Sequence, residues 1–200
     1  MRVCILMGLL LILGCTSKPN LYVSNYQEAL DSTVQITINQ SGYGSAFYIG
    51  DGLFITAAHC VVDHNGNLYD LAIDDNEVEV LAWDSEADVA IIKCDEMCHL
   101  KPFKLSNKQS KLTDIVYSVG THLGQQEAIS KGYVSMLVQE GYIVSAPINQ
   151  GTSGGPLLNE KLEAIGVNCS ILSVIGGFNG IAFCSDVKYA KVLMEDLAKD

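Results

Sequence analysis

Apolar and polar residues alternate in short runs along most of this 200-residue chain. In the run 33–38, Val34, Ile36 and Ile38 alternate with polar residues, which is the period of a half-buried β-strand. Turns rich in Gly, Asn and Asp separate similar runs, which predict further strands at 45–50, 53–57, 78–83, 89–93, 114–119, 128–138, 142–146, 163–169 and 180–184. Many short strands with almost no helical periodicity predict an all-β barrel or sandwich.

One segment with helical periodicity closes the chain. Ser185 and Asp186 are residue types that cap helices, and the segment after them has one apolar face, formed by Val187, Ala190, Leu193, Met194 and Leu197. We therefore expect a C-terminal helix over about 186–198. A short element near 26–30 is expected to lead into the first strand.

The N-terminus has the pattern of a secretory signal. Met1 and Arg2 form a minimal positive region, and residues 3–13 form an apolar run too short to span a bilayer. The run ends in Ile-Leu-Gly-Cys at 12–15, which resembles the lipobox of bacterial lipoproteins, where the Gly–Cys bond is cut and the cysteine is lipidated. This resemblance implies a signal peptide over 1–14, a lipid on Cys15 and a tether over 15–30. The alternative is an ordinary signal peptide with a chance cysteine.

A lipid on Cys15 would tether the folded domain to a membrane surface without a spanning helix. The expected location is the bacterial cell envelope, outside the cytoplasm. The formal net charge is −11 at pH 7, and Arg2 is the only arginine. Because no basic stripe is present, a nucleic-acid partner is not expected, and attachment to anionic lipid by charge is disfavoured.

The stretch 149–156, Asn-Gln-Gly-Thr-Ser-Gly-Gly-Pro, places one serine among glycines. Such a turn lets the backbone approach a ligand closely. Gly151 allows the amides of Gly151 and Ser153 to point into one small space, which would hold an oxygen that gains negative charge. Taken alone, the stretch also fits an ordinary glycine turn with an exposed serine.

A serine hydroxyl needs a base to accept its proton, and that base needs a third group to orient it. His59 follows the apolar run 53–55, and Asp88 opens the strand-like run 89–93, where its burial against an imidazole is natural. These two residues are the candidates for base and acid. The competing residues fit loops or solvated turns better; they are His64, His99, His122, Asp63 and Asp84.

Three segments, TAAHC at 56–60, DVAIIK at 88–93 and GTSGGP at 151–156, resemble the His, Asp and Ser segments of the trypsin-like (chymotrypsin-fold) serine endopeptidases. Four others, GSAF at 44–47, VGTHLG at 119–124, SKGYVS at 130–135 and GIAF at 180–183, are similar to the bacterial HtrA/Deg branch. The resemblance implies two packed antiparallel six-stranded β-barrels, at about 31–105 and 112–184, within a protease domain over 31–200. The segment 101–107 would join the barrels, with the active site in the cleft between them.

The same resemblance implies the roles of the site residues. Ser153 would attack the scissile carbonyl, His59 would accept and return the proton, and Asp88 would fix the imidazole tautomer. The amides of Gly151 and Ser153 would form the oxyanion hole. The partner would be a protein or peptide substrate, and no metal or organic cofactor is required. Two other functions stay open: a catalytically silent binding lipoprotein, and an esterase with the same triad.

In this family the residues just before the serine and two later strands wall the primary substrate pocket. Here the corresponding set is Ala146, Pro147, Ile148, Asn168, Cys169, Ser170, Ile171, Gly180 and Ala182. It contains no acid that could pair with Lys or Arg, so we expect cleavage after small or medium apolar residues. Cys169 stands where the family often has a Ser or Thr that touches the triad Asp, and a thiol is a weaker hydrogen-bond donor.

The cysteines show no recognisable pairing framework. After Cys4 and Cys15, five remain, an odd number that favours free and mostly buried thiols. Cys94 and Cys98 lie close enough in the sequence for a local disulfide. Together with His99 they offer too few ligands for an expected metal site.

Overall fold

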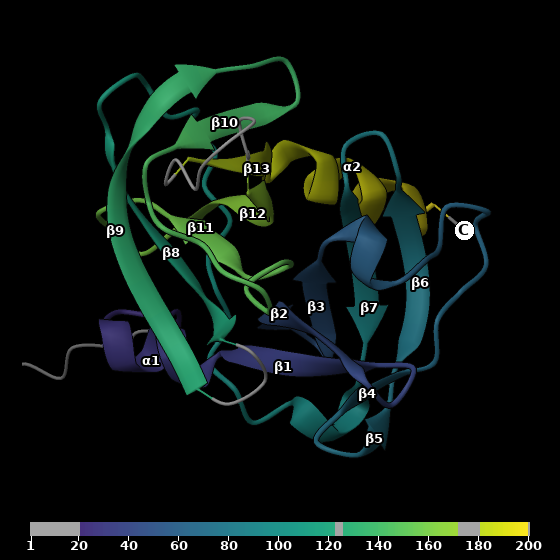
Figure 1. Ribbon diagram of the computed structural model, residues 1–200. Coiled ribbons are helices and arrows are strands. Elements are labelled where there is room, and N and C mark those ends of the chain that lie inside the picture. Colours follow the sequence, from purple (N-terminus) through teal and green to yellow (C-terminus); the bar gives the residue numbers. More distant parts are fainter. Residues whose placement is uncertain (1–20, 123–125, 172–180, 200) are drawn as a thin grey trace, which may run out of the picture.

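In the computed structural model, which describes residues 21–122, 126–171 and 181–199, two β units lie side by side (Figure 1). The first unit contains β1 (Thr33–Ile38), β2 (Gly42–Gly50), β3 (Leu53–Thr56), β4 (Leu71–Ile73), β5 (Asn76–Glu77), β6 (Glu79–Asp84) and β7 (Val89–Lys93). The second contains β8 (Ile115–His122), β9 (Gln126–Leu137), β10 (Gly141–Val144), β11 (Pro156–Leu158), β12 (Ala164–Ile171) and β13 (Ala182–Asp186). The all-β fold predicted from the sequence is confirmed.

The first unit differs in detail from a six-stranded barrel. Its ladder has seven strands in the order β5-β4-β1-β2-β3-β7-β6, without hydrogen-bonded closure between β5 and β6. These two end strands are consecutive in the chain, and only Val78 separates them. The first half of this bent segment pairs with β4 and the second half pairs with β7. The backbone at the buried Val78 therefore connects the two end strands of the ladder. In a six-stranded barrel, one continuous strand would take the place of β5 and β6.

The second unit is a closed six-stranded barrel with the order β10-β13-β12-β11-β8-β9, as expected. Its longest pairing is the antiparallel ladder of β8 and β9, which runs from Ile115 opposite Tyr133 to His122 opposite Gln126. Register shifts interrupt the pairings of β10 with β9, β11 with β12, and β12 with β13. Such bulges bend strands and increase their twist, which a small closed barrel requires.

The segment between the units contacts both of them. The N–H of Phe103 donates to the carbonyl of Tyr48 at 2.8 Å, and its ring packs edge-on against Phe47 with centroids 5.6 Å apart. Two residues later, Leu105 forms a parallel bridge with Ala164 of β12. The connection is therefore a packed part of the interface between the units.

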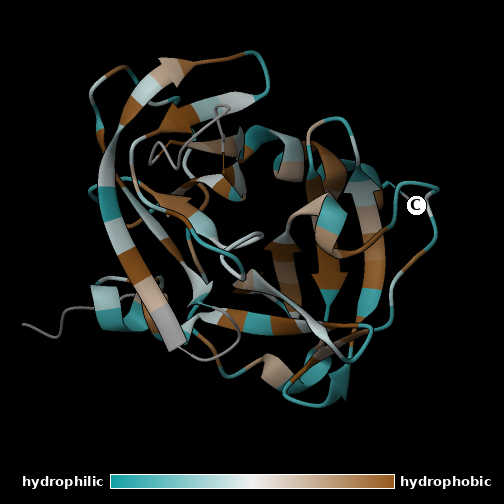
Figure 2. Ribbon diagram, in the orientation of Figure 1, coloured by the Kyte–Doolittle hydropathy of each residue, from teal (hydrophilic) through white to brown (hydrophobic). Residues whose placement is uncertain are grey.

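The larger apolar core is centred on the first unit and continues into the second, and a smaller core lies within the second unit. In Figure 2 the apolar colour concentrates on β3 and β7, two neighbouring interior strands of the first sheet. The largest fully buried side chains of the first core and the adjoining connection are Phe47, Phe54, Phe103, Ile36, Ile55, Ile73, Ile91 and Ile92. The second core is built around Tyr142, Leu157 and Ile165.

Two α-helices of the described chain flank the sheets. Helix α1 (Tyr26–Asp31) begins at Asn25, whose side chain accepts the N–H of Glu28. Its Ala29 is fully buried, and Lys101 forms a 2.9 Å ion pair with Glu28. The second half of the expected tether 15–30 is thus packed on the domain. The signal peptide and Cys15 lie outside the described residues.

The C-terminal helix α2 (Lys188–Leu197) starts two residues later than predicted, because β13 continues to Asp186. The carboxylate of Asp186 still accepts a helix amide, that of Lys188, at 2.9 Å. The helix crosses back to the first unit and packs on β6 and β7 (Figure 1). Within the described residues, neither helix is long and apolar enough to span a membrane.

Candidate active site

His59 and Asp88 meet at the ends of two paired strands. His59 lies in the short 3-10 helix η1 (Ala58–Cys60) after β3, and Asp88 directly precedes β7. The Nδ1 atom of His59 lies 2.8 Å from Oδ2 and 3.0 Å from Oδ1 of Asp88. The backbone N–H of His59 also donates to Oδ1, at 2.9 Å. One carboxylate therefore orients both the ring and the backbone of the candidate base.

The turn before β7 sets the position of Asp88. Asp88 has a φ of +56°, in the left-handed region that Asp tolerates better than most residues. Asp84 holds the turn, because its Oδ1 accepts the N–H groups of Glu86 and Ala87 at 2.9 Å each. Asp84, a competitor of Asp88 in the sequence, thus stabilises the turn that carries Asp88.

The electrostatics of the pair favour proton uptake by the imidazole. Burial lowers the pKa of His59, but hydrogen bonds with Asp88 and Cys60 outweigh it and raise the pKa above 6.5. Burial likewise raises the pKa of Asp88, and the hydrogen bonds with His59 bring it below 3.8. The His59 side chain is 48 % exposed, so the ring remains accessible from solvent. Asp88 thus stays ionised and stabilises the imidazolium that forms when His59 accepts a proton.

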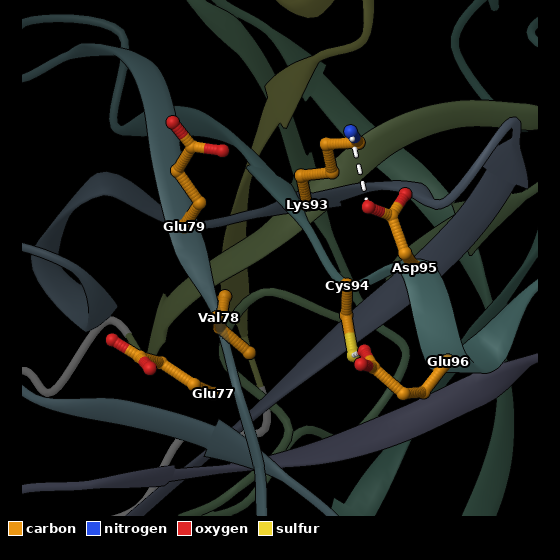
Figure 3. A pocket seen from close by; sticks show the side chains of 7 residues that line it. All are labelled: Glu77, Val78, Glu79, Lys93, Cys94, Asp95 and Glu96. Atoms are coloured by element: carbon orange, nitrogen blue, oxygen red, sulfur yellow. Dashed lines mark hydrogen bonds and ion pairs between the residues drawn. The ribbon is translucent and has the colours of Figure 1, made fainter.

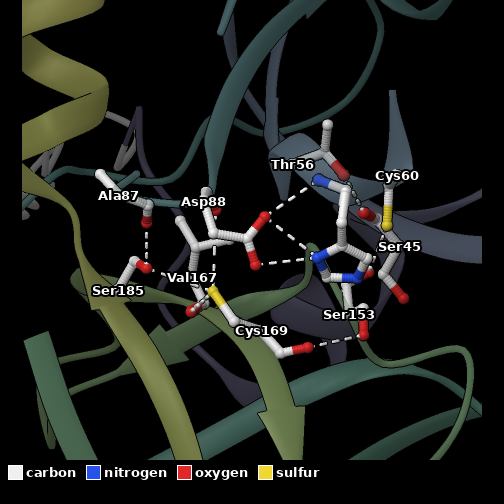
Figure 4. Close-up of polar contacts among 10 residues, drawn as sticks. Ser45, Thr56, Cys60, Ala87, Asp88, Ser153, Val167, Cys169 and Ser185 are labelled. Atoms are coloured by element: carbon white, nitrogen blue, oxygen red, sulfur yellow. Dashed lines mark hydrogen bonds and ion pairs between the residues drawn. The ribbon is translucent and has the colours of Figure 1, made fainter. Parts of the chain in front are cut away.

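Ser153 lies in the loop before β11, at the junction of the two units. Its hydroxyl donates to the backbone carbonyl of Cys169 at 2.9 Å (Figure 4). Its own carbonyl accepts the N–H of Ser45 in the first unit at 2.7 Å, and the Cys60 thiol lies 3.8 Å from the same oxygen. Among the described residues, no hydrogen bond joins Ser153 to the ring of His59. Catalytic hydrogen bonds are often long or unformed without substrate, so the geometry is compatible with a Ser–His pair.

The loop around Ser153 leaves two amides available. Gly151 has a φ of +94°, and the Thr152 hydroxyl closes the preceding turn by donating to the carbonyl of Asn149 at 2.7 Å. The N–H of Gly154 donates to the backbone carbonyl of Asn168 at 2.7 Å. In the described part of the chain, no acceptor binds the N–H of Gly151 or Ser153. These are the two amides that the sequence assigns to an oxyanion hole.

Cys169 connects the turn of Asp88 with the second barrel. Its buried thiol lies 3.7 Å from the carbonyl oxygen of Asp88 and 3.2 Å from the hydroxyl of Ser185 (Figure 4). Ser185 in turn donates to the carbonyl of Ala87. Burial, followed by the charge of Asp88, raises the pKa of the Cys169 thiol, so it is a neutral contact. The sequence pointed to Cys169 at this site, but to Ser185 only as a helix-capping residue; Ser185 instead lies on β13 and does not cap α2.

The residues predicted to line the substrate pocket differ in their accessibility. Ser170 is exposed at the end of β12, and Ile171 is half-buried beside it. Asn168 is fully buried, and its side-chain amide donates to the carbonyls of Val119 and Pro156, which places this amide inside the barrel. Of the predicted pocket residues before the serine, Ala146 and Ile148 are buried and Pro147 is exposed. Ala182 and Cys169 are also buried. Gly180 lies outside the described residues.

The competing histidines and acids are placed elsewhere. His64 and His99 are exposed in loops, and His122 ends β8. Asp63 accepts the N–H groups of Asn65 and Asn67 within its own loop. Within the described residues, His59 is the histidine whose ring is bound to a carboxylate. The five cysteines of the described region are all free, and Cys98 is the exposed one.

A hollow of about 400 Å³ lies at the opposite end of β7 from Asp88 (Figure 3). Acidic side chains dominate its lining, which consists of Glu77, Val78, Glu79, Lys93, Cys94, Asp95 and Glu96. Lys93 and Asp95 form a 3.2 Å ion pair on one side of it (Figure 3). Among the described residues, no group of three or more His, Cys, Asp or Glu side chains is arranged to hold a metal ion.

Two packed β units, with a His–Asp pair in one and a serine in a glycine-rich loop of the other, define the chymotrypsin-like class of fold and site. The family comparison agrees with this class. The chain belongs to the trypsin-like peptidase domain family, whose profile matches residues 44–167.

Its relatives include a probable periplasmic DegP-like serine endoprotease of Pseudomonas putida, 32% identical over 169 residues, which cover 78% of this chain and 35% of the relative. A protein of the same description from Pseudomonas fluorescens is 34% identical over 159 residues, covering 74% of this chain and 33% of the relative. The chain thus spans about a third of the length of these curated relatives.

Solved structures agree with this assignment. A serine endoprotease from Yersinia pestis is 25% identical with a TM-score of 0.71, over 89% of this chain and 68% of the other. A protease from M. tuberculosis in its active form has a TM-score of 0.72 at 20% identity, over 86% of this chain and 82% of the other. The second likeness supports the fold alone.

Proposed function

We propose that the chain is a membrane-tethered, extracytoplasmic serine endopeptidase that acts through an acyl-enzyme. The observation that carries this proposal is the His59–Asp88 pair facing a loop in which Ser153 and two available amides come together. The names of the relatives, periplasmic serine endoproteases, support the reaction class and the location outside the cytoplasm.

The reaction starts when Ser153 leaves the Cys169 carbonyl and hydrogen-bonds to the free Nε2 of His59. The Ser153 oxygen then forms a bond to the scissile carbonyl carbon while its proton passes to His59. Negative charge develops on the carbonyl oxygen, which the amides of Gly151 and Ser153 stabilise. His59 returns the proton to the leaving amine as the peptide bond breaks. Water, activated by the same imidazole, then hydrolyses the acyl ester on Ser153.

Asp88 acts throughout as the orienting group. Its two oxygens hold Nδ1–H and the backbone N–H of His59, which leaves Nε2 as the acceptor for the serine proton. The ionised carboxylate also stabilises the imidazolium between the two proton transfers.

A fluorophosphonate probe tests the proposal, because only an activated serine reacts with it. Wild-type protein should be labelled on Ser153, and Ser153→Ala should abolish both the labelling and the hydrolysis of peptides. The matched control is Ser41→Ala, which changes an exposed serine in the turn before β2 and should label like wild type. A wild-type protein that is folded but unlabelled would instead support the catalytically silent binding lipoprotein. Ester turnover without peptide turnover would support the esterase.

A further inference from the structure

Ser45 of β2 binds both residues whose amides form the proposed oxyanion hole. Its hydroxyl donates to the carbonyl of Gly151 at 2.6 Å. Its backbone N–H donates to the carbonyl of Ser153 at 2.7 Å. Ser45 is fully buried, so these hydrogen bonds do not compete with water.

A second hydroxyl reaches the same carbonyl from the other β unit. Thr121, a buried residue of β8, lies with its Oγ1 3.2 Å from the carbonyl oxygen of Gly151. Its N–H donates to the Ser45 hydroxyl oxygen at 2.9 Å, which leaves the Ser45 proton for Gly151. With one proton each, the two hydroxyls can both donate to the Gly151 carbonyl, one from each unit. Their oxygens lie 3.2 Å apart, and the carbonyl of Gly44 is a longer alternative acceptor for Thr121, at 3.4 Å.

The packing around these contacts leaves no room for additional atoms. A Cβ atom added at Gly120 would lie 3.1 Å from the Ser45 hydroxyl oxygen and 2.8 Å from the Cα of Thr152. At Gly154 it would lie 2.1 Å from the Ser45 carbonyl oxygen. The loop that carries the nucleophile thus rests directly on the backbone of Ser45.

Fixed carbonyls restrict where the amides can point. Glycine rotates easily about both of its backbone torsions, and Gly151 has a left-handed φ of +94°. Because its carbonyl is held by two hydroxyls, the ψ torsion of Gly151 is fixed. The Gly151 amide can then change direction only by rotation about φ. The bond from Ser45 to the Ser153 carbonyl restricts the second residue in the same way.

We propose that Ser45 and Thr121 are positioning residues that set the direction of the oxyanion-hole amides, one from each β unit. This proposal rests on the proposed function, since it assigns a reaction to the Ser153 loop. Neither hydroxyl touches the substrate. Each acts through the Gly151 carbonyl, so its loss should weaken stabilisation of the transition state more than binding of the ground state.

The experiment compares Ser45→Ala, Thr121→Val and Thr121→Ser with wild type on a fluorogenic peptide that has valine before the scissile bond. Rates are expressed per active site, counted by endpoint fluorophosphonate labelling. Ser45→Ala should lower kcat about 10- to 100-fold with KM nearly unchanged, approaching the loss of one oxyanion donor. Thr121→Val should lower it about fivefold, as expected for one hydrogen bond, and Thr121→Ser should restore it. A peptide boronate, whose tetrahedral adduct places an oxygen in the hole, should lose affinity in parallel with kcat.

Thr33→Val is the matched control, because Thr33 is also buried and its hydroxyl donates to a backbone carbonyl, that of Ala29, at 2.8 Å. It should change neither kcat per active site nor boronate affinity. Equal kcat and boronate affinity in wild type and Thr121→Val would overturn the positioning role, even if Ser45→Ala fails to fold. The positioning role would also be overturned if the Ser45 and Thr121 variants changed only the number of labelled active sites and left kcat per active site unchanged. Absence of labelling in the wild type would overturn the proposed function itself, and the positioning role with it.

Discussion

The hydroxyl of Ser153 donates to the backbone carbonyl of Cys169, 2.9 Å away, instead of to the ring of His59. To act as a nucleophile, Ser153 must exchange this acceptor for the imidazole nitrogen. The exchange replaces one hydrogen bond by another, so its net free-energy cost is small. Under the proposed mechanism, this is a resting arrangement in which His59 and Asp88 are already paired and Ser153 still has to turn from the Cys169 carbonyl to the imidazole.

The first prediction concerns the triad as a unit. Ser153→Ala removes the nucleophile and His59→Ala the base; because the two act together, each should lower turnover by about 10⁶-fold, and the double variant by no more than either alone. Asp88→Asn should lower it by about 10⁴-fold, because the amide favours the wrong imidazole tautomer. Peptide hydrolysis measures all three, with folding checked by circular dichroism.

Two variants serve as controls for this series. Asp74 has a left-handed φ of +47° like Asp88, but it is exposed in a turn, so Asp74→Asn repeats the same chemical change outside the site. His64→Ala removes an exposed histidine. Both should stay within about twofold of wild type, as surface substitutions generally do. Activity in Ser153→Ala, or a loss in Asp74→Asn as large as in Asp88→Asn, would show that the roles are wrongly assigned.

The second prediction concerns pH. A general base works only when neutral, so the rate should rise as pH increases through the pKa of His59. Because the hydrogen bonds with Asp88 and Cys60 raise this pKa, the acid limb of kcat/KM should lie above pH 6.5. In Asp88→Asn the carboxylate is lost while the burial remains, so the pKa of His59 should fall. An NMR titration of the His59 ring in the Ser153→Ala background measures the shift without turnover, and an unchanged titration after Asp88→Asn would contradict the assigned cause.

The third prediction concerns Gly154. Its φ of +88° and a Cβ position 2.1 Å from the Ser45 carbonyl and 2.2 Å from the Thr56 hydroxyl leave no place for a side chain. Gly154→Ala should therefore displace the nucleophile loop and abolish activity. Gly66→Ala is the matched control, since Gly66 has a φ of +82° with nothing within 4 Å of the added atom. It should cost only the strain of a left-handed alanine, about 1–2 kcal/mol, in denaturant unfolding. Equal stability losses in the two variants would contradict the packing argument.

Much of the fold followed from local patterns. The alternation in β1 and the apolar runs of β3 and β7 are long enough to identify strands from the sequence. Strands β4, β5 and β11, of two or three residues each, carry no period and were not predicted. The break at Val78, which turns the first barrel into a seven-strand ladder, depends on pairing with two distant strands. No local signal marks it.

The site shows the same division. The segments around His59, Asp88 and Ser153 identify themselves by residue type and order, because the chemistry needs those types. Ser45 and Ser185 hydrogen-bond to the backbone carbonyls of residues 106 and 98 positions away. The GSAF segment at 44–47 pointed to the family, but it gave no sign of the partner of Ser45, so both contacts became visible only in the folded chain. Asn168 shows the converse case: family position suggested the pocket, whereas hydrogen bonds to Val119 and Pro156 hold its amide in the barrel.

The fourth prediction concerns specificity. We expect cleavage after Ala, Val, Ile or Leu, because the predicted pocket set contains no carboxylate to pair with a basic side chain. The accessible described members of that set, Pro147, Ser170 and Ile171, are small or apolar. A peptide-library profile of the wild-type protein measures the preference. Strong selection of Lys, Arg or Glu before the scissile bond would refute the pocket assignment.

The last prediction concerns the membrane. If the Ile-Leu-Gly-Cys run at 12–15 is a lipobox, Cys15 carries the lipid, and the five residues 16–20 separate it from the first described residue, Leu21. In that case the acyl chains on Cys15 would hold the domain at the membrane surface. The full chain expressed in a bacterium should therefore partition into the detergent phase and incorporate labelled palmitate. Cys15→Ser should abolish both, and Cys98→Ser, which changes the exposed cysteine of the folded domain, should change neither. If labelling and partitioning persist in Cys15→Ser, the lipobox assignment is wrong and the chain reaches its membrane, if any, by another route.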